Sequence, residues 1–259
     1  MIFKQYRYEP LSQASYFLAC WREKVAFVVD PVMDLGVDFY LEEAQRFKVS
    51  IRGILETHIH ADYASCAPRL AEAAGCPYYL HESAPETIPY TPLRDDQVLV
   101  LGNVRIEVIH TPGHTPEHVC YLITDVTRAD EPWAILTGDS LLVGDVGRPD
   151  LLVGDQALKE EDPKGRAMVQ YSSIKERVFT LPDHVEVYPG HYGKSACGGI
   201  NMSAKASSTI YFEKKYNLPM RQPNAEIFSE FVRDTSKPLP DRYQLLKKQN
   251  LGLAAPDLD

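Results

Sequence analysis

Hydrophobic positions in the first half of the chain alternate between strand-like and helix-like spacing. Apolar runs at residues 16–20 and 25–29 predict two strands joined by a turn at residues 21–24. Further strands are expected at residues 49–55, 98–101, 104–109, 119–124 and 133–137, and helices at residues 39–47 and 69–74. Gly75 should end the second helix, and Gly102-Asn103 should turn a hairpin. This mixture of strands and helices predicts an α/β fold.

The second half of the chain has a mostly helical pattern. Helices are expected at residues 167–180, 203–216, 225–232 and 242–249, with a short strand at residues 185–188 and a polar loop at residues 154–165. No internal repeat is present. The proline-rich residues 236–240 resemble a linker, but too few residues follow them for another domain. We therefore expect a single domain, residues 1–259, in which residues 235–259 are a helical C-terminal extension.

Composition narrows the range of partners and locations. The chain has 259 residues, 44% of them hydrophobic, and a formal net charge of −9. Such a charge argues against a nucleic-acid-binding protein, which needs a basic face. The first twenty residues have no apolar core of a signal peptide, and no apolar run approaches membrane-spanning length. The five cysteines form no CxxC pair, which indicates free thiols in a cytoplasmic protein.

The clearest chemical signal directly follows the buried strand at residues 49–55. There the chain reads Thr57-His-Ile-His-Ala-Asp-Tyr63. Residues two apart on an extended chain project to the same side, so His58, His60 and Asp62 can converge. Imidazoles and carboxylates are ligands of divalent transition metals. Spacing alone does not separate His58 from His60 as a ligand.

Three more motifs follow predicted strands. His114 lies in Thr-Pro-Gly-His-Thr-Pro-Glu-His, residues 111–118, where Gly113 allows a tight turn. Asp139 lies in Leu-Thr-Gly-Asp-Ser, and His191 ends Tyr-Pro-Gly-His. Ligand sites of α/β folds gather at strand ends. The four motifs together therefore predict one metal site.

The order HxHxD, PGHT, TGDSL and PGH resembles the metallo-β-lactamase superfamily over residues 16–216. The resemblance implies an αββα sandwich with its metal site at one edge of the two sheets, followed by a C-terminal helical segment in this chain. Residues 60–62, 138–150 and 207–216 resemble the persulfide dioxygenase branch. Some members of that branch carry a C-terminal rhodanese domain, which we do not expect in this chain.

By this resemblance, the metal ligands are His58, His114 and Asp139. Two histidines and one carboxylate with open positions are typical of non-haem Fe(II) oxygenases, so the cofactor is expected to be one Fe(II) per chain. His60 then becomes a pocket residue beside the metal. The resemblance also assigns catalytic roles to the residues around the metal, which are His60, Asp62, Tyr63 and His191.

Two departures from the family pattern are informative. Hydrolases of this family usually read HxHxDH, whereas this chain has Tyr63 at the last position. Tyrosine is a poorer zinc ligand than histidine, and Asp62 with His191 are too few to hold a second metal. A mononuclear site is therefore expected. Glu117 stands where glycine is common and has no assigned role, and His118 is expected to be structural.

The substrate side is less defined by the sequence. Candidate pocket residues are Arg148, Asp150, Tyr171, Tyr192 and Arg221. Arg148 and Asp150 have the alternative of pairing with each other. Arg221, Lys214 and Lys215 are also candidates for binding the carboxylates of a glutathione-like substrate. For these three residues, a position on the solvated surface of a helix is the alternative. Cys66 and Cys197 are expected to be packed thiols, with a position facing the pocket as the alternative for Cys197.

The resemblance implies oxidation of a low-molecular-weight persulfide by O₂ to sulfite and free thiol. Glutathione persulfide is the expected substrate, and coenzyme A and bacillithiol persulfides are compatible. The expected partners are these small molecules, with neither nucleic acid nor membrane, and a homo-oligomer is compatible with the sequence. Two alternatives remain open: a zinc-dependent hydroxyacylglutathione-type thioester hydrolase, and a non-catalytic metal- or sulfur-binding module.

Overall fold

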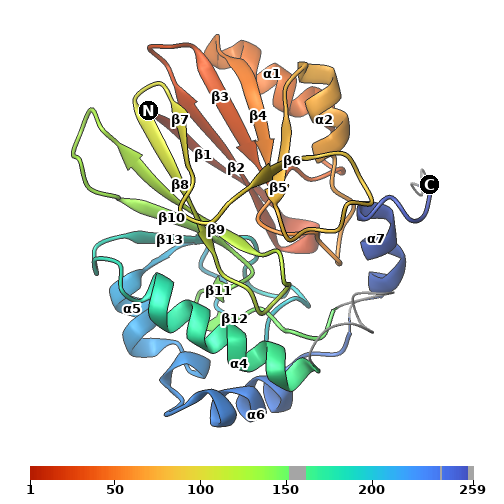
Figure 1. Ribbon diagram of the computed structural model, residues 1–259, viewed down its shortest axis with the longest axis vertical. Helices are drawn as coiled ribbons and strands as arrows, with labels where there is room; N and C mark the ends of the chain where they lie inside the picture. Colours follow the sequence, from red (N-terminus) through yellow and green to blue (C-terminus); the bar gives the residue numbers. More distant parts are fainter. Residues whose placement is uncertain (152–161, 240, 256–259) are drawn as a thin grey trace.

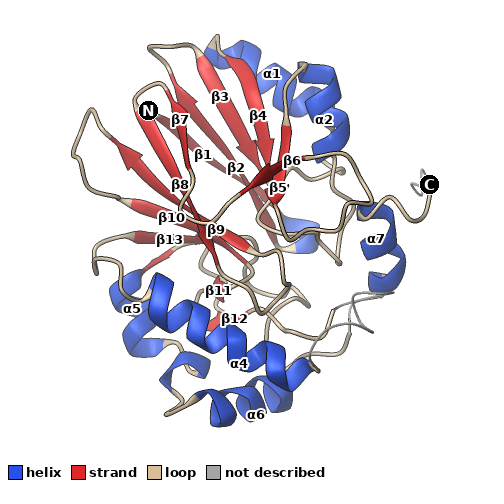
Figure 2. Cartoon of the chain, in the orientation of Figure 1, coloured by secondary structure: helices blue, strands red, loops and turns tan. Residues whose placement is uncertain are grey.

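Two six-stranded sheets form the centre of the molecule. The computed structural model describes residues 1–151, 162–239 and 241–255. One sheet has the strand order β1-β2-β3-β4-β5-β6 and the other β14-β13-β10-β9-β8-β7, while β11 pairs with β12 alone. Figure 2 shows the strands between one group of helices, α1 and α2, and a second group, α4, α5 and α6.

The first sheet comprises β1 (Ile2–Tyr8), β2 (Gln13–Cys20), β3 (Val25–Val29), β4 (Ser50–Leu55), β5 (Tyr78–His81) and β6 (Thr91–Leu93). The second comprises β7 (Val98–Leu101), β8 (Val104–His110), β9 (Val119–Asp125), β10 (Ala134–Gly138), β13 (Glu186–Pro189) and β14 (Ser208–Thr209), and the small hairpin is β11 (Leu141–Leu142) with β12 (Asp145–Val146). The helices are η1 (Glu9–Leu11), α1 (Val37–Phe47), α2 (Ala67–Ala74), α4 (Pro163–Ser173), η2 (Ile174–Val178), α5 (Ile210–Tyr216), η3 (Pro219–Arg221), α6 (Ala225–Thr235) and α7 (Tyr243–Asn250).

Side-chain alternation along the strands explains the layers. Phe17 and Ala19 of β2 pack with Leu70 of α2 and its neighbours on the outer face of the first sheet. Tyr16 and Leu18 face the other way, into the core between the two sheets. A third cluster joins the outer face of the second sheet to α4, α5 and α6. The predicted αββα sandwich is therefore confirmed (Figure 1).

Local signals placed most element ends correctly. Gly75 follows α2 with φ 62°, in the left-handed region that favours glycine after a helix. Gly102, with φ 58°, lies in the turn of the β7–β8 hairpin. The turn expected at residues 21–24 also joins β2 to β3. The predicted helices at residues 225–232 and 242–249 correspond to α6 and α7.

Other predictions were incomplete or wrong. The expected helix at residues 203–216 is helical only from Ile210, because Ser208 and Thr209 form β14 against β13. The predicted polar loop at residues 154–165 falls partly outside the described residues, and Pro163–Gly165 begin α4 instead. Strands β1, β5, β6, β11 and β12 were not predicted. β1 is an edge strand whose side chains are at most partly buried, so its apolar pattern is weak.

Within the described ranges, no helix is long and apolar enough to span a membrane. The division of the chain into a single domain with an extension at residues 235–259 stays a prediction.

Candidate metal centre

Three loops at strand ends bring His58, His114 and Asp139 together. His58 follows β4, His114 lies between β8 and β9, and Asp139 follows β10. The three side chains are buried, and their ligand atoms all lie within 4.8 Å of one another. The structure thus brings together the three residues that the family resemblance identifies as metal ligands.

The hydrogen bonds of these residues leave one donor atom of each free to face a metal. The Nε2 atoms of His58 and His114 lie 3.9 and 3.7 Å from the same oxygen, Oδ2 of Asp139. His114 Nδ1 lies 2.6 Å from the carbonyl oxygen of Arg148, and His58 Nδ1 lies 3.0 Å from Oγ1 of Thr57. Asp139 Oδ2 is buried without a hydrogen-bond partner. These residues therefore fit a metal, because each histidine is oriented through its other nitrogen.

Protonation also suits metal binding. Burial, reinforced for His58 by neighbouring histidines, lowers the pKa of both His58 and His114. Burial alone would raise the pKa of Asp139, but the neighbouring histidines, His191 first, bring that pKa well below its usual range. The centre therefore presents neutral imidazoles and an ionised carboxylate, which are the forms that coordinate metals.

Asp30 supports the first ligand loop, although none of the sequence motifs singled it out. Its Oδ1 accepts the backbone N–H of Thr57 at 2.7 Å, and its Oδ2 accepts the Thr57 hydroxyl at 2.9 Å. The carboxylate also lies 3.3 Å from Nε2 of His60. Asp30 directly follows β3, which is parallel to β4, so its position beside the end of the next strand was a usable signal.

His60 and Tyr63 form a second ring layer beside His58. The His58 and His60 ring centroids are 4.1 Å apart, and those of His60 and Tyr63 are 4.3 Å apart. Burial favours neutral His60, but Asp30 raises its pKa above the usual range. The Tyr63 hydroxyl is buried without a hydrogen-bond partner. Nε2 of His60 thus faces Asp30, and His60 is not one of the three residues whose ligand atoms cluster.

A second donor group lies beside the first and consists of Asp62, His191 and Cys197, whose ligand atoms also lie within 4.8 Å of one another. His191 lies between two carboxylates, with Nδ1 2.7 Å from Asp139 and Nε2 2.8 Å from Asp62. These carboxylates raise the pKa of His191 well above its usual range, although burial acts in the opposite direction. Cys197 is buried as expected, and the alternative of a thiol facing the pocket also agrees with its position beside Asp62 and His191.

Glu117 and His118 tie the three ligand loops together. Nε2 of His118 accepts the backbone N–H groups of Asp139 at 3.1 Å and Ser140 at 3.2 Å. Oε1 of Glu117 accepts the backbone N–H of Ile59 at 3.0 Å. Since His114 lies in the same loop, residues 111–118 contact both other ligand loops. The structural role expected for His118 agrees with these contacts, and Glu117 now has a position that accounts for it.

Close approach explains two glycines and one buried glutamine at the centre. A Cβ atom on Gly113 (φ 142°) would lie 2.5 Å from the backbone Cα of Gln170 in α4. A Cβ atom on Gly138 (φ 48°) would lie 2.6 Å from Nε2 of His118. Gln170 Nε2 donates to the carbonyl oxygens of Ser140 at 3.1 Å and Gly147 at 3.0 Å. Gln170, which the sequence did not single out, therefore fixes the loop that carries Asp139.

Two of the predicted pocket residues pair with each other. Arg148 Nε and Nη2 lie 2.6 and 2.9 Å from the two carboxylate oxygens of Asp150. Arg148 also donates to the carbonyl oxygens of Lys237 and Pro238. The alternative of an Arg148–Asp150 pair therefore agrees with the structure.

The other pocket candidates make local contacts. The Tyr171 hydroxyl donates to Gln222 at 3.1 Å, and the Arg7 guanidinium lies 4.4 Å from the centre of the Tyr192 ring. Arg221 is exposed. Lys214 pairs with Asp183 and Lys215 donates to Tyr211, which places both on the solvated helix surface. Cys66 is buried and donates to Val32, as a packed thiol should. A substrate role for the five pocket candidates stays a prediction.

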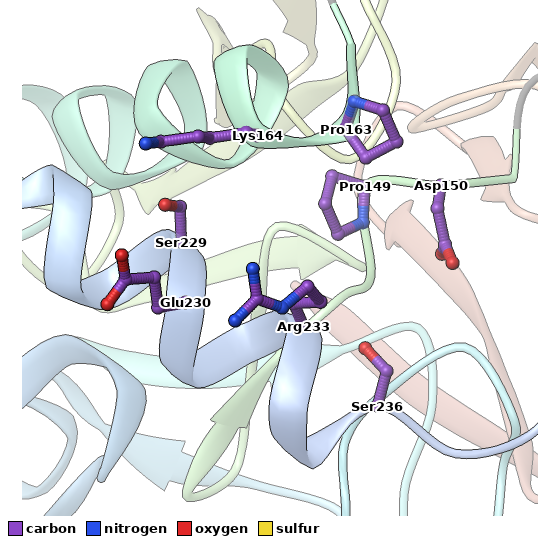
Figure 3. A pocket seen from close by; sticks show the side chains of 8 residues that line it. All are labelled: Pro149, Asp150, Pro163, Lys164, Ser229, Glu230, Arg233 and Ser236. Carbon is purple, nitrogen blue, oxygen red and sulfur yellow. The ribbon is translucent and has the colours of Figure 1, made fainter.

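A hollow of about 120 Å³ lies between α4 and α6 beside Asp150. Figure 3 shows Lys164 of α4 on one side, Ser229, Glu230 and Arg233 of α6 on the other, and Pro149 with Asp150 at one end. None of its lining residues belongs to the two donor groups. Its cations, Lys164 and Arg233, are balanced by two carboxylates, so its charge alone selects no ligand.

Comparisons with known proteins agree with this architecture. Residues 8–191 match the family model described as Metallo-beta-lactamase superfamily. A crystal structure of a metallo-beta-lactamase from Staphylococcus aureus subsp. aureus COL superposes with a TM-score of 0.85 at 30% identity, covering 96% of this chain and 72% of that one.

Two curated relatives carry names from different enzyme classes. The chain is 30% identical over 200 residues to probable hydroxyacylglutathione hydrolase glo2 of Schizosaccharomyces pombe, covering 76% of this chain and 68% of that protein. It is 24% identical over 259 residues to the human protein named persulfide dioxygenase ETHE1, mitochondrial, covering 94% of this chain and 85% of that protein. The family match, the sandwich and the clustered His58, His114 and Asp139 lead to one conclusion: the chain belongs to the metallo-beta-lactamase superfamily.

Proposed function

We propose that this protein is an Fe(II)-dependent persulfide dioxygenase. Its substrate would be glutathione persulfide or a related low-molecular-weight persulfide. One persulfide, one O₂ and one water would give one thiol, one sulfite and two protons. Tyr63 carries this proposal, because it stands where hydrolases of the family usually place a second-metal histidine, and its hydroxyl is buried beside His60.

The extent of similarity supports the same choice. The match to the human persulfide dioxygenase covers 94% of this chain, whereas the match to the yeast hydrolase covers 76%. The match to the dioxygenase therefore takes in more of the chain outside the shared metal-binding motifs.

In this proposal, His58, His114 and Asp139 hold the iron. Bound there, iron would supply open positions for both reactants and the redox chemistry of O₂ activation. Arg148 orients His114 through its carbonyl oxygen, and Thr57 orients His58. The buried rings of His60 and Tyr63 exclude water on one side of the ligands. His191 and Asp62 are catalytic candidates because they contact Asp139 directly or through one another.

A thioester hydrolase is the second candidate, and one specific observation favours it. Cys197 supplies a third donor beside Asp62 and His191, so the loss of a histidine at position 63 is partly compensated. A zinc-dependent hydrolase would use such a second site. The non-catalytic alternative is disfavoured by the complete first donor group.

The decisive experiment compares both reactions on the same preparation. Protein purified anaerobically should contain about one iron per chain, because His58, His114 and Asp139 form one iron-binding site. With glutathione persulfide it should consume O₂ and release sulfite, and with an acyl-glutathione thioester it should release little thiol. A panel with coenzyme A and bacillithiol persulfides then identifies the carrier. Rapid thioester hydrolysis with two bound zinc ions and no O₂ uptake would replace the proposal with the hydrolase.

A further inference from the structure

The C-terminal helix α7 contacts the metal-binding loop through its side chains. Asn250 Nδ2 donates to the carbonyl oxygens of His60 at 2.9 Å and Tyr63 at 2.8 Å. Its Oδ1 accepts the backbone N–H of Ser65 at 3.0 Å. Lys247, one helical turn earlier, donates through Nζ to the carbonyl oxygen of Ile59. In Figure 1, α7 lies apart from α4, α5 and α6, so it is not simply part of the helical layer on the second sheet.

Lys247 is a buried cation in an unusual position. Its side chain is fully buried, and its Nζ lies 3.9 Å from Oε1 of the equally buried Glu117. The same Glu117 oxygen accepts the backbone N–H of Ile59 at 3.0 Å. Both backbone polar groups of Ile59 are therefore bonded by the Glu117–Lys247 pair. Because Ile59 lies between His58 and His60, the orientation of its peptide groups determines where those two imidazoles project.

The Glu117–Lys247 pair is expected to have a role other than stabilising the fold. A buried ion pair contributes little net stability, because desolvation of both charges offsets their attraction, and apolar residues often replace such pairs without loss. The irregular loop does need partners for its buried carbonyl groups. Asn250 and Lys247 provide them at residues 59, 60 and 63, all within five positions of His58.

We infer that α7 is a component of the metal centre, in which Lys247 and Asn250 are positioning residues that hold the loop of His58 in its ligating geometry. Docking of α7 and binding of the metal then strengthen each other, as required when two events share one ordered loop. This inference does not depend on the reaction proposed above, because it concerns metal affinity and not turnover.

Single variants test the positioning role. Lys247→Met and Asn250→Ala should each weaken Co²⁺ or Zn²⁺ binding by about 10- to 100-fold, the usual effect of losing residues that orient metal ligands. Lys248→Met is the matched control, because Lys248 is exposed on the same helix, and it should leave the affinity unchanged. Affinity is measured against a competing chelator well below the melting temperature, and the visible spectrum of bound Co²⁺ reports ligand geometry. Unchanged affinity and an unchanged Co²⁺ spectrum in folded Asn250→Ala would overturn the inference.

A double variant separates positioning from stability. Lys247→Met alone leaves Glu117 as an uncompensated buried charge, which destabilises the fold. The double variant Glu117→Gln/Lys247→Met removes both charges, so it should regain unfolding free energy while its metal affinity stays low. Recovery of both properties together would show that Lys247 acts only on stability.

The wild-type protein offers a reciprocal test that needs no substitution. Adding Zn²⁺ to the metal-free protein should slow amide hydrogen exchange in α7, residues 243–250. Exchange in α6, residues 225–235, serves as the internal control and should change much less, because the side chains of Ser229, Arg233 and Thr235 bond within that helix and not to the ligand loop. Equal protection of both helices would contradict specific coupling between α7 and the metal.

Discussion

Nε2 of His118 lies 3.1 Å from the backbone nitrogen of Asp139 and accepts its N–H hydrogen bond. The adjacent N–H of Ser140 donates to the same atom. His118→Leu would leave the buried N–H of Asp139 unpaired, at a cost of about 1–3 kcal/mol in unfolding free energy. The N–H of Ser140 would keep its second acceptor, the carbonyl oxygen of Thr137 at 3.1 Å. Metal affinity should also fall, because the backbone of Asp139 would lose its support. Chemical denaturation and metal titration measure the two effects, and His184→Leu, at an exposed histidine, is the control. Stability within the error of wild type would contradict this role for His118.

Alanine substitutions should distinguish His60 from the residues that hold the metal. We expect His114→Ala and Asp139→Ala to abolish iron binding and sulfite formation, because each removes a clustered donor. His60→Ala should retain some iron but lose activity, since His60 contacts Asp30 and packs against the His58 ring at a tilted angle. Elemental analysis and sulfite release provide the readouts. A His60→Ala protein devoid of iron would make His60 a ligand.

Tyr63→His should raise the affinity for a second zinc ion. The new imidazole would join Asp62 and His191, and Cys197 supplies a further donor. Sulfite formation should not improve, because it needs one iron with open positions. Zinc stoichiometry after desalting from zinc excess measures the effect, and Tyr63→His/Cys197→Ala should bind the second ion more weakly. If Tyr63→His still binds a single metal, tyrosine is not the reason for a mononuclear site.

Asp145, which lies outside the metal centre, should make the stability of the fold depend on pH. Its oxygens accept the backbone N–H groups of Val146 at 2.8 Å and Asn201 at 2.9 Å, and burial raises its pKa to about 6. Because the folded pKa is raised, the protonated form favours folding: its contribution is full below the unfolded pKa, near 4, and is lost as pH rises through about 6.

The matched variant Asp145→Asn lacks this titration. Relative to it, the wild type should lose about 2–2.5 kcal/mol of unfolding free energy between pH 4 and pH 7. Urea denaturation of both proteins across that range measures the difference. A difference that stays constant with pH would mean that Asp145 does not change its protonation in the folded state.

Much of the sandwich follows from local patterns. The strands predicted at residues 25–29 and 98–101 match β3 and β7 at both ends. Short apolar runs bounded by turn residues are typical of strands. The residues of β1 were missed because an edge strand lacks a fully buried face. The expected helix at residues 203–216 failed because pairing of Ser208 with Val187 outweighs the local preference.

By itself, the sequence determined that His58, His114, Asp139 and His191 follow strand ends, and strand ends meet at one edge of a sheet. Only the tertiary structure decided which atoms face one another: Nε2 of His58 toward Asp139, Nε2 of His60 toward Asp30, and Cys197 beside Asp62. It also decided that Lys247 and Asn250, which lie about 190 residues after Ile59 and His60 in the chain, hold the first ligand loop. Such contacts depend on loops packed across the ends of two sheets, and no local periodicity encodes the distance between residues so far apart in the chain.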